Sequence, residues 1–520
     1  MVLAAKEATS TAPPTSLPPV PGSVVHLLHA AADRRAHAKA ISFEGTSLTY
    51  GQLAGVVGAL AHRLARRAGP GERVAVLMQN SLDLAVATYA VHSLRAQVTA
   101  LNPAYGPDEL AHMLADARPC LVLHDDSVRH DVRALCPWLP QDAVLATRGG
   151  AAFAQLLDEA RALPPELPSH DELATLQYTG GTTGRPKGVD ILHRQLAWNL
   201  AQREAWLPTC PGDEVVLCTT PLFHVSAVAM CLHLALMAGS ALVIQRRFDA
   251  RRVLDTIAAE RVTRMSGVPT VFYDLLRALQ PADRARLGSL RSCYSGAAPL
   301  PRETLRLFEE ATGCPIYEGY GASEAGPCLT YNPVHLPRKA GSVGLPVPAS
   351  RLRIVDVETG AAITAPGRAG EVQVSGPHVM AGYRNLPAET VQALRDGWYC
   401  TGDVGALDED GYLTLQGRRH DTINVGGFKV YPLEVERVLL ACPDVGEAAA
   451  FAAGDERLGQ VVHAWVTAAP GATPDVQGLI GRCAAQLAPY KVPRRIGVIA
   501  QLPRTAVGKL ARSRLEPVAP

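Results

Sequence analysis

The first part of the chain alternates short apolar runs with longer segments of helical periodicity. Residues 73–78 (RVAVLM) form one apolar run, residues 82–94 repeat apolar positions at helical spacing after a potential cap at Ser81, and residues 98–101 form a second run. Such runs are typical of buried parallel strands joined by helices. The pattern therefore predicts an α/β fold with more than one parallel sheet, since it recurs at residues 215–217, 241–244 and 290–294.

From about residue 341 the pattern changes. Turn residues become dense, and the apolar positions between them alternate at 351–355, 371–375 and 412–416. Alternation over short segments is typical of antiparallel strands with one buried face. This part of the chain is therefore predicted to be an antiparallel β module attached to the parallel body.

A smaller α+β unit is predicted after residue 417. Its expected elements are a helix from 433, strands at 447–451 and 461–466, a helix at 476–487 and a last strand at 496–499. With a domain boundary near residues 418–421, the prediction is a disordered lead-in (1–22), an N-terminal domain (23–419) and a C-terminal lid domain (420–520).

One uncharged segment, residues 221–245, is long enough to cross a bilayer. Pro221, His224, His233 and Gly239 interrupt it, and the β-branched run at 241–244 is separate from the helical part. We therefore expect a buried helix followed by a buried strand, with no membrane span.

Composition narrows the function classes. The 520 residues contain 50 Lys and Arg against 49 Asp and Glu, so the net charge is +1, and no basic tract occurs. A neutral chain provides no field for attracting nucleic acid, so no nucleic-acid partner is expected. The 11 cysteines are scattered without a CxxC pair, which favours neither disulfides nor a zinc site and indicates a reducing, cytoplasmic location.

A turn-rich stretch at residues 178–188 (YTGGTTGRPKG) gives the strongest local signal for a ligand site. Its glycines let backbone N–H groups approach a ligand closely, its threonine hydroxyls can donate hydrogen bonds, and Lys187 supplies a positive charge. Pro186 before the lysine, and no Ser or Thr after it, distinguish the stretch from a Walker A loop. It is predicted to bind phosphate rather than to be a flexible surface loop.

Two further segments place single polar residues among small side chains. In residues 317–327 (YEGYGASEAGP), Glu324 can reach a bound metal and Tyr320 offers an aromatic face to a base. In residues 397–418, Asp403 lies in a Thr-Gly-Asp turn suited to accepting hydrogen bonds from two vicinal hydroxyls. An ordinary glycine-rich turn and an Asx-turn aspartate are the alternatives for these two segments.

Together these segments resemble the adenylate-forming superfamily, which includes acyl-CoA synthetases, peptide-synthetase adenylation domains and beetle luciferase. The resemblance spans roughly residues 23–512 in family order. Besides residues 178–188 it rests on PLFH (221–224), SGAAPL (295–300), YGASE (320–324), TGD (401–403), GRRHDTINVGGFKVYPLEVE (417–436) and PRTAVGKLAR (503–512). It implies a mobile C-terminal lid, the cofactors ATP, Mg²⁺ and CoA, and activation of a small-molecule carboxylic acid to acyl-AMP, with release of pyrophosphate, before transfer to CoA.

The resemblance also implies roles for individual residues. The ATP phosphates would be held by Thr179, Gly181, Thr182, Thr183 and Lys187, and the nucleoside by Ala297, Glu318, Tyr320, Ser323, Asp403 and Arg418. Glu324 would coordinate Mg²⁺, and Lys509 would bridge the carboxylate and the α-phosphate. The implied catalytic set is Lys509, Glu324, Thr183, Lys187 and His224, with Gly426 and Gly427 lining the tunnel for the pantetheine arm of CoA.

An acyl pocket is implied as well. Its expected lining is His224, Ser226, Val268, Tyr294, Gly321, Ala322, Gly326 and Pro327. These positions include no Lys or Arg to pair with a second carboxylate, and no counterpart of the peptide-synthetase pocket aspartate is evident. The expected substrate is therefore an apolar monocarboxylic acid, either medium to long aliphatic or bulky aryl or polycyclic.

Three positions depart from the family pattern. Gly180 replaces a serine in the loop, Ser323 replaces a threonine, and His420 stands at the hinge position where the family usually has Asp or Lys. A hinge must absorb a large backbone rotation, so the departure at His420 bears on the second step, transfer to the thiol. An adenylating enzyme that passes acyl-AMP to a carrier protein or a separate ligase is therefore the alternative. A non-catalytic scaffold is disfavoured because Lys187, Glu324 and Lys509 are all retained.

Overall fold

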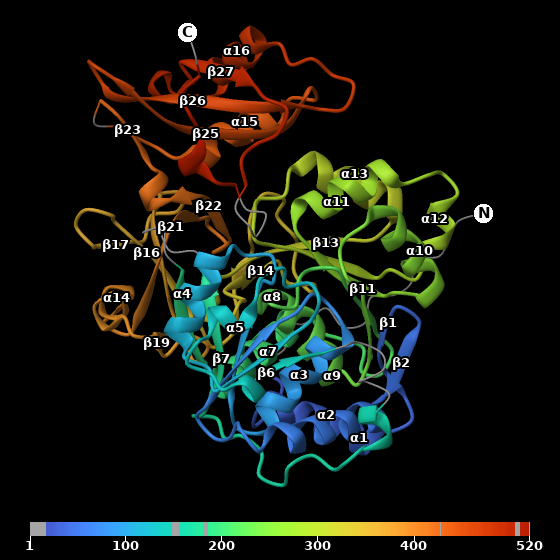
Figure 1. The fold of residues 1–520 in the computed structure, drawn as a ribbon. Helices are drawn as coiled ribbons and strands as arrows, with labels where there is room; N and C mark the ends of the chain where they lie inside the picture. Colours follow the sequence, from blue (N-terminus) through green and yellow to red (C-terminus); the bar gives the residue numbers. More distant parts are fainter. Residues whose placement is uncertain (1–16, 148–154, 180–185, 427, 505–509, 519–520) are drawn as a thin grey trace.

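The computed structural model describes residues 17–147, 155–179, 186–426, 428–504 and 510–518. Within these residues the strands form four sheets, two in a large N-terminal body, one antiparallel sheet beside it and one in the C-terminal part. In Figure 1 the C-terminal part, drawn in red, lies at one end of the molecule above the N-terminal body. The mixed α/β fold predicted from the sequence is confirmed.

The first sheet has seven strands in the order β19-β8-β7-β4-β3-β5-β6. Its parallel part joins β3 (Arg73–Leu77), β4 (Gln97–Leu101), β5 (Leu121–His124), β6 (Val144–Ala146) and β7 (Leu173–Thr179). Two antiparallel strands extend it, β8 (Lys187–Leu192) and β19 (Gly382–Tyr383). The sheet therefore ends in a segment that comes from far along the chain.

The second sheet has nine strands in the order β15-β14-β13-β12-β11-β9-β10-β1-β2. Its parallel centre contains β1 (Lys39–Phe43), β9 (Val215–Cys218), β10 (Ala241–Ile244), β11 (Arg264–Gly267), β12 (Ser292–Ser295) and β13 (Ile316–Tyr320). Antiparallel strands close both edges, namely β2 (Thr46–Thr49), β14 (Thr330–Tyr331) and β15 (Leu345–Pro346).

Helix α3 (Leu82–Ser93) packs between these two sheets, because it contacts β3 and β4 of the first and β1 of the second. The side chain of Ser81 caps it by accepting from the Leu84 N–H, as the sequence predicted. All of its residues except Asp83 are buried, so this helix is covered around its whole circumference. The other helices of the body are α1 (Val24–Arg35), α2 (Tyr50–Leu64), α4 (Pro107–Ala117), α5 (Val132–Leu135), α7 (His193–Trp206), α10 (Ala250–Glu260), α11 (Pro269–Ala278), α12 (Asp283–Arg286) and α13 (Arg302–Thr312).

The uncharged segment forms buried helix and strand, as expected. It contains α8 (Val225–Ala227), a π-helical stretch (Val228–His233), α9 (Leu234–Met237) and then β10. Among the described residues, no helix combines the length and the apolar character needed to cross a membrane. All eleven cysteines are free.

The antiparallel module is also confirmed. It joins β16 (Arg351–Val355), β17 (Ala362–Ile363), β18 (Gly370–Ser375), β20 (Leu394–Arg395), β21 (Trp398–Leu407) and β22 (Leu413–Arg418), with α14 (Pro387–Ala393) beside it. The long strand β21 pairs with β18, β20 and β22, so it holds the module together.

The C-terminal part has its own sheet and its own hydrophobic core. The strands are β23 (Ile423–Val425), β24 (Phe428–Val430), β25 (Val445–Asp455), β26 (Gly459–Ala468) and β27 (Arg495–Val498), and the helices are α15 (Pro432–Leu440) and α16 (Val476–Gln486). A short 3₁₀ turn, Arg419–Asp421, connects β22 to β23. The domain boundary between residues 419 and 420 stays a prediction, and it falls within this turn.

Candidate active site

The predicted phosphate loop joins two antiparallel strands. Strands β7 and β8 pair in a register that places Thr179 opposite Lys187 at the mouth of the loop. Residues 180–185, which include the predicted phosphate contacts Gly181, Thr182 and Thr183, lie outside the described residues. The strand pairing fixes both ends of the loop, because a register slip of one residue would turn Lys187 to the other face of the sheet.

Glu324, the predicted Mg²⁺ ligand, lies next to this hairpin. It sits in a 3₁₀ turn (Ser323–Ala325) that also contains the predicted nucleotide contact Ser323. The hydroxyl of Tyr383 donates to Glu324 Oε1 at 2.9 Å. Tyr383 lies on β19 opposite Val189 of β8, and its ring centroid is 5.2 Å from Lys187 Nζ. Tyr383 therefore connects the predicted metal ligand to the predicted phosphate lysine.

The predicted ribose pair is set by strand register. Asp403 on β21 lies directly opposite Arg418 on β22, and Asp403 Oδ1 is 3.1 Å from Arg418 Nε. The hydroxyl of Tyr320, at the end of β13, donates to Asp403 Oδ2. The Asp403 N–H donates to Thr401 Oγ1 at 3.0 Å, which stabilises the turn at Gly402, where φ is +70°. Three residues predicted from separate motifs are therefore in contact.

Tyr399 lies between the metal and ribose groups. It is 4% exposed, and burial raises the pKa of its hydroxyl well above the ordinary value, with contributions from the charges of Glu324 and Asp403. Burial and the Asp403 carboxylate likewise raise the pKa of Tyr320. Neutral tyrosines at this position can donate hydrogen bonds to both carboxylates without adding charge.

The predicted adenine contacts come together at the ends of two neighbouring strands. Ser295 at the end of β12 pairs with Glu318 on β13, and Glu318 Oε1 accepts from the Leu300 N–H at 3.1 Å. The loop between them carries Ala297 on the surface with a left-handed φ of +67°. Burial raises the pKa of the Glu318 carboxyl to about 7, against the opposing effect of the backbone donors from Leu300 and Gly341.

The predicted acyl-pocket residues lie at the carboxyl ends of adjacent parallel strands. His224 and Ser226 follow β9, Val268 follows β11, and Gly321 follows β13 directly. Ligands of open α/β sheets bind at this edge, in the crevice beyond the strand ends. His224 lies beside Phe223, with ring centroids 5.0 Å apart.

The remaining pocket positions are tightly packed. A Cβ on Gly321 would stand 1.3 Å from the carbonyl oxygen of Pro327, so no larger residue fits there. Gly326, with φ +69°, packs against Asn199, and Ala322 is half-buried. Tyr294 is 2% exposed and belongs to a buried cluster (Leu207, Met230, Tyr294, Cys328, Tyr331, Val347).

Two residues predicted for the lid, Gly427 and Lys509, lie outside the described residues. Arg504 and Leu510, which flank residues 505–509, form an isolated antiparallel β-bridge. Arg512 just after it pairs with Glu436, and its Nε lies 3.4 Å from Asp421. Gly426 has φ +57° and donates its N–H to the Leu458 carbonyl at 2.9 Å.

At the predicted hinge, His420 is about half exposed. Its Nε2 lies 3.4 Å from Asp421 Oδ1, and Asp421 in turn faces Arg512. The hinge turn is therefore linked by charge to the segment that follows Lys509.

Sequence reasoning missed Tyr383 and Tyr399. Both bear on the predicted carboxylates Glu324 and Asp403. Tyr399 stands within the segment 397–418 but was given no role, whereas Tyr383 lies outside the segments that the sequence singled out. Tyr399 sits two residues before the Thr-Gly-Asp turn, and that spacing on an extended strand places both residues on one face. No comparable local signal marks Tyr383.

The predicted Mg²⁺ site fits the side chains present. Glu324 is 8% exposed, and among the described residues a neutral tyrosine hydroxyl, not a cation, holds its carboxylate. A buried carboxylate without a cation is costly, so a bound cation would stabilise it. The described residues contain no group of three or more His, Cys, Asp or Glu placed to hold a metal. One carboxylate plus phosphates and waters is the usual Mg²⁺ environment in nucleotide sites.

Comparison with protein families matches most of the chain. Residues 28–384 match the family described as AMP-binding enzyme, and residues 434–509 match the AMP-binding enzyme C-terminal domain. A long-chain-fatty-acid–CoA ligase of Bacillus subtilis (strain 168) is 34% identical over 514 residues, covering 92% of this chain and 91% of the relative. A feruloyl-CoA synthase of Amycolatopsis sp is 36% identical over 481 residues, covering 92% and 95%.

A solved structure shares the fold over nearly the full length. The o-succinylbenzoate coenzyme A synthetase of Bacillus subtilis, in complex with ATP and magnesium ion, superposes with a TM-score of 0.81. It is 29% identical, and the match covers 94% of this chain and 98% of that one.

Proposed function

This chain belongs to the AMP-binding enzyme family and is an AMP-forming acid–CoA ligase, and from this premise we propose that its substrate is an apolar monocarboxylic acid. The acid is activated with ATP to acyl-AMP, pyrophosphate leaves, and the CoA thiol then takes the acyl group. Support for an apolar acid comes from the proposed pocket positions, which carry no Lys or Arg. The relatives named for fatty-acyl and feruloyl substrates agree with that class.

One observation carries the assignment of the site. Two polar groups make up a cluster near the β7–β8 hairpin, although the residues come from separate segments. Glu324 pairs with Tyr383, Asp403 pairs with Tyr320 and Arg418, and the charges of both carboxylates act on Tyr399. The cluster supports a nucleotide held with its phosphates at the hairpin and its ribose at Asp403. Mg²⁺, when bound, would be held by Glu324 and would neutralise charge on the phosphates.

Each group then has a physical task. A carboxylate is repelled by ATP, so the site must screen both anions and hold them in line for attack on the α-phosphate. Lys187 would screen the phosphates from its place over Tyr383. Asp403, aligned by Arg418 and Tyr320, would accept from the ribose hydroxyls, which fixes the α-phosphate relative to the acid. Lys509 would supply the cation that meets the developing charge.

The test is acid-dependent exchange of labelled pyrophosphate into ATP, followed by thioester formation with CoA. A panel of aliphatic and aryl acids should give exchange, with an apolar acid preferred by kcat/KM over acetate, malonate and amino acids. Glu324→Gln should abolish most of the exchange, whereas Glu303→Gln, an exposed glutamate on α13, should leave it unchanged.

Two results would contradict the proposal. No exchange with any acid of the panel would remove the adenylation step. A second result would be exchange together with thioester formation that is no faster than the uncatalysed reaction of CoA with acyl-AMP. The protein would then be an adenylating enzyme that serves a carrier protein or a partner ligase, and not a CoA ligase.

A further inference from the structure

Arg203, on helix α7, is a buried cation that the proposed mechanism does not use. It is 1% exposed, and its guanidinium carbon lies 5.7 Å from the ring centroid of Tyr294. Tyr294 is a proposed acyl-pocket residue and belongs to the buried cluster that also contains Met230 and Cys328. The charge of Arg203 is therefore buried beside this cluster.

Within the described residues, only one nitrogen of this guanidinium has a hydrogen-bond partner. Nη1 donates to Glu204 Oε2 at 2.6 Å, whereas Nε and Nη2 are buried and have no hydrogen-bond partner there. Nε and Nη2 form one edge of the planar group, the edge that binds two oxygen atoms side by side. Native proteins rarely leave such buried donors unpaired, so this edge requires oxygen partners, which an ordered water or a ligand supplies.

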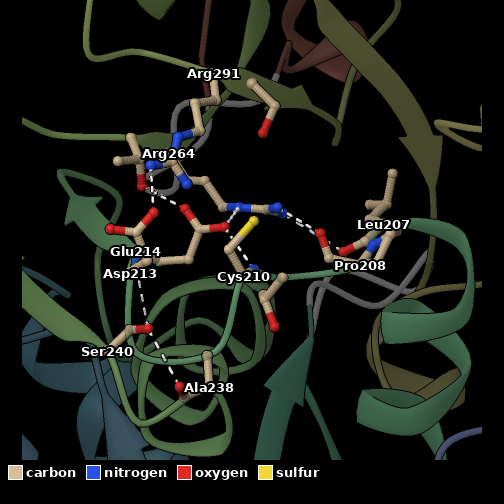
Figure 2. A network of polar contacts seen from close by, with 12 residues as sticks. Leu207, Pro208, Cys210, Asp213, Glu214, Ala238, Ser240, Arg264 and Arg291 are labelled. Atoms are coloured by element: carbon tan, nitrogen blue, oxygen red, sulfur yellow. Dashed lines mark hydrogen bonds and ion pairs between the residues drawn. The ribbon is translucent and has the colours of Figure 1, made fainter. Parts of the chain in front are cut away.

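A second buried arginine nearby shows how such a group is normally satisfied. Arg264 lies on the same tyrosine, with its guanidinium carbon 5.8 Å from the ring centroid. Its Nε makes an ion pair with Glu214 at 2.8 Å without hydrogen-bond geometry, and its two other nitrogens donate to the Tyr294 hydroxyl and to the Pro208 carbonyl. Figure 2 shows Arg264 between Glu214 on one side and Leu207 and Pro208 on the other. Arg203 differs because, in the part of the chain that the structure describes, its second edge has no such set of acceptors.

Arg203 lies near a segment of the proposed acyl pocket. Asn199, one helical turn before Arg203, donates to the Cys328 carbonyl at 2.8 Å and accepts from the Cys328 N–H at 3.1 Å. Cys328 directly follows the proposed pocket residues Gly326 and Pro327. Burial raises the pKa of the Cys328 thiol to about 12, and the Arg203 charge opposes that rise, which places the guanidinium close to this segment.

We propose that Nε and Nη2 of Arg203 bind oxygen atoms at the end of the substrate acid that lies farthest from its reacting carboxylate. The inference rests on the proposed function and refines it: the acid is apolar along most of its length and ends in neutral oxygen acceptors. Adjacent hydroxyl and methoxyl groups on an aromatic ring have this geometry, since they present two oxygens to one edge of a guanidinium.

Neutral acceptors fit better than a second carboxylate. Glu204 already balances the charge of Arg203, and Glu214 balances that of Arg264. A second carboxylate would therefore bring an uncompensated negative charge into a buried place, which is unfavourable. A neutral oxygen acceptor satisfies the donors without that cost.

The experiment compares matched acids on the full-length enzyme. Pyrophosphate exchange is measured with cinnamate, 4-hydroxy-3-methoxycinnamate and 4-carboxycinnamate, for the wild type and for Arg203→Met. The wild type should prefer the hydroxy-methoxy acid over cinnamate by about 10- to 100-fold in kcat/KM, the usual range for hydrogen bonds to a charged group. Arg203→Met should lose this preference and keep its activity toward cinnamate.

Controls separate a binding role from a structural one. Arg194→Met removes an exposed arginine from the same helix and should leave the preference unchanged. Arg203→Gln, which keeps one amide donor, should retain part of the preference; it also provides a second variant if Arg203→Met does not fold.

Three outcomes would count against the inference. Equal kcat/KM for cinnamate and the hydroxy-methoxy acid in the wild type would overturn it, as would a preference that survives both substitutions at Arg203. Preference for 4-carboxycinnamate would overturn the neutral-acceptor assignment. Absence of exchange with every acid of the wider panel would instead refute the proposed function, so the two failures are distinguishable.

Discussion

Low pH is expected to destabilise the N-terminal body, because the fold keeps three buried histidines neutral. His92, His193 and His233 come from α3, α7 and the π-helical stretch, and each is at most 1% exposed. The rings of His92 and His193 lie 5.1 Å apart, and those of His92 and His233 lie 6.4 Å apart. Burial lowers the pKa of His193 to about 4 and that of His233 to about 3, and it holds the pKa of His92 well below its usual value.

The sign and size of the effect follow from proton uptake. Below pH 6.5 the unfolded chain binds protons at these positions and the folded chain does not, so the free energy of unfolding decreases until the folded-state pKa values are reached. Each histidine lowers the free energy of unfolding by up to about 1.4 kcal/mol for every unit by which the pH falls. Between pH 6.5 and 4.5 this gives about 2 kcal/mol for His193 and about 2 kcal/mol for His233, a large part of a typical stability of about 5–15 kcal/mol.

The assay is urea unfolding at pH 6.5 and pH 4.5, with His233→Asn compared to the wild type. Asparagine cannot titrate, and it can keep the hydrogen bond that Tyr89 makes to His233 Nδ1 at 2.7 Å. The variant should lose about 2 kcal/mol less than the wild type between the two pH values. His37→Asn, at an exposed position, is the control. An identical pH-dependent loss in His233→Asn and the wild type would refute the reasoning.

Further predictions concern the site. Lys509→Ala should slow pyrophosphate exchange by about 10²–10³-fold, by analogy with the loss of one preorganised donor, and should spare thioester formation from pre-made acyl-AMP. Gly427→Leu should spare exchange and slow thioester formation. Unchanged exchange in Lys509→Ala would contradict the lysine assignment. Asp403→Asn should raise KM for ATP by about 10-fold or more, since Tyr320 and Arg418 both bind its carboxylate, and an unaltered KM would exclude the ribose role. Unfolded glutamate loses its proton above about pH 4.5, whereas folded Glu318 keeps it to about pH 7, so wild-type stability should fall as the pH rises through this window. Glu318→Gln should therefore gain up to about 3 kcal/mol at pH 8 and nothing at pH 4.5 in denaturant unfolding, and a gain that is equal at both pH values would point to another cause.

The sequence predicted the strands well where burial is two-sided. The runs at 73–78 and 98–101 became β3 and β4, because parallel strands covered on both faces must be continuously apolar. The helix at 82–94 was found equally well, since its cap at Ser81 is a local signal. Register and chain order beyond such local segments cannot be obtained in this way.

In the site, too, local features could be predicted from the sequence and contacts between distant segments could not. Glu324 and Asp403 stand in glycine-rich turns that are visible in the sequence, so their chemistry could be predicted. Tyr383 acquires its contact with Glu324 only because β19 pairs with β8, a pairing between distant segments that no local pattern indicates. Arg203 likewise has no sequence signal, because its burial depends on the strands and loops that meet around Tyr294.

The pairing of β1 with β10 has a consequence for how the chain is made. Ile41 lies opposite Leu242 in this parallel pair, so about 200 residues must be synthesised before the first strand finds its partner. At the usual rate of about 5–20 residues per second, the β1–β2 hairpin waits roughly 10–40 s on the ribosome with one edge unpaired. A lone hairpin is marginally stable in water and its open edge can pair with other chains. Fragments that end before residue 241 should therefore aggregate, and expression should depend on chaperones that bind the N-terminal part during synthesis.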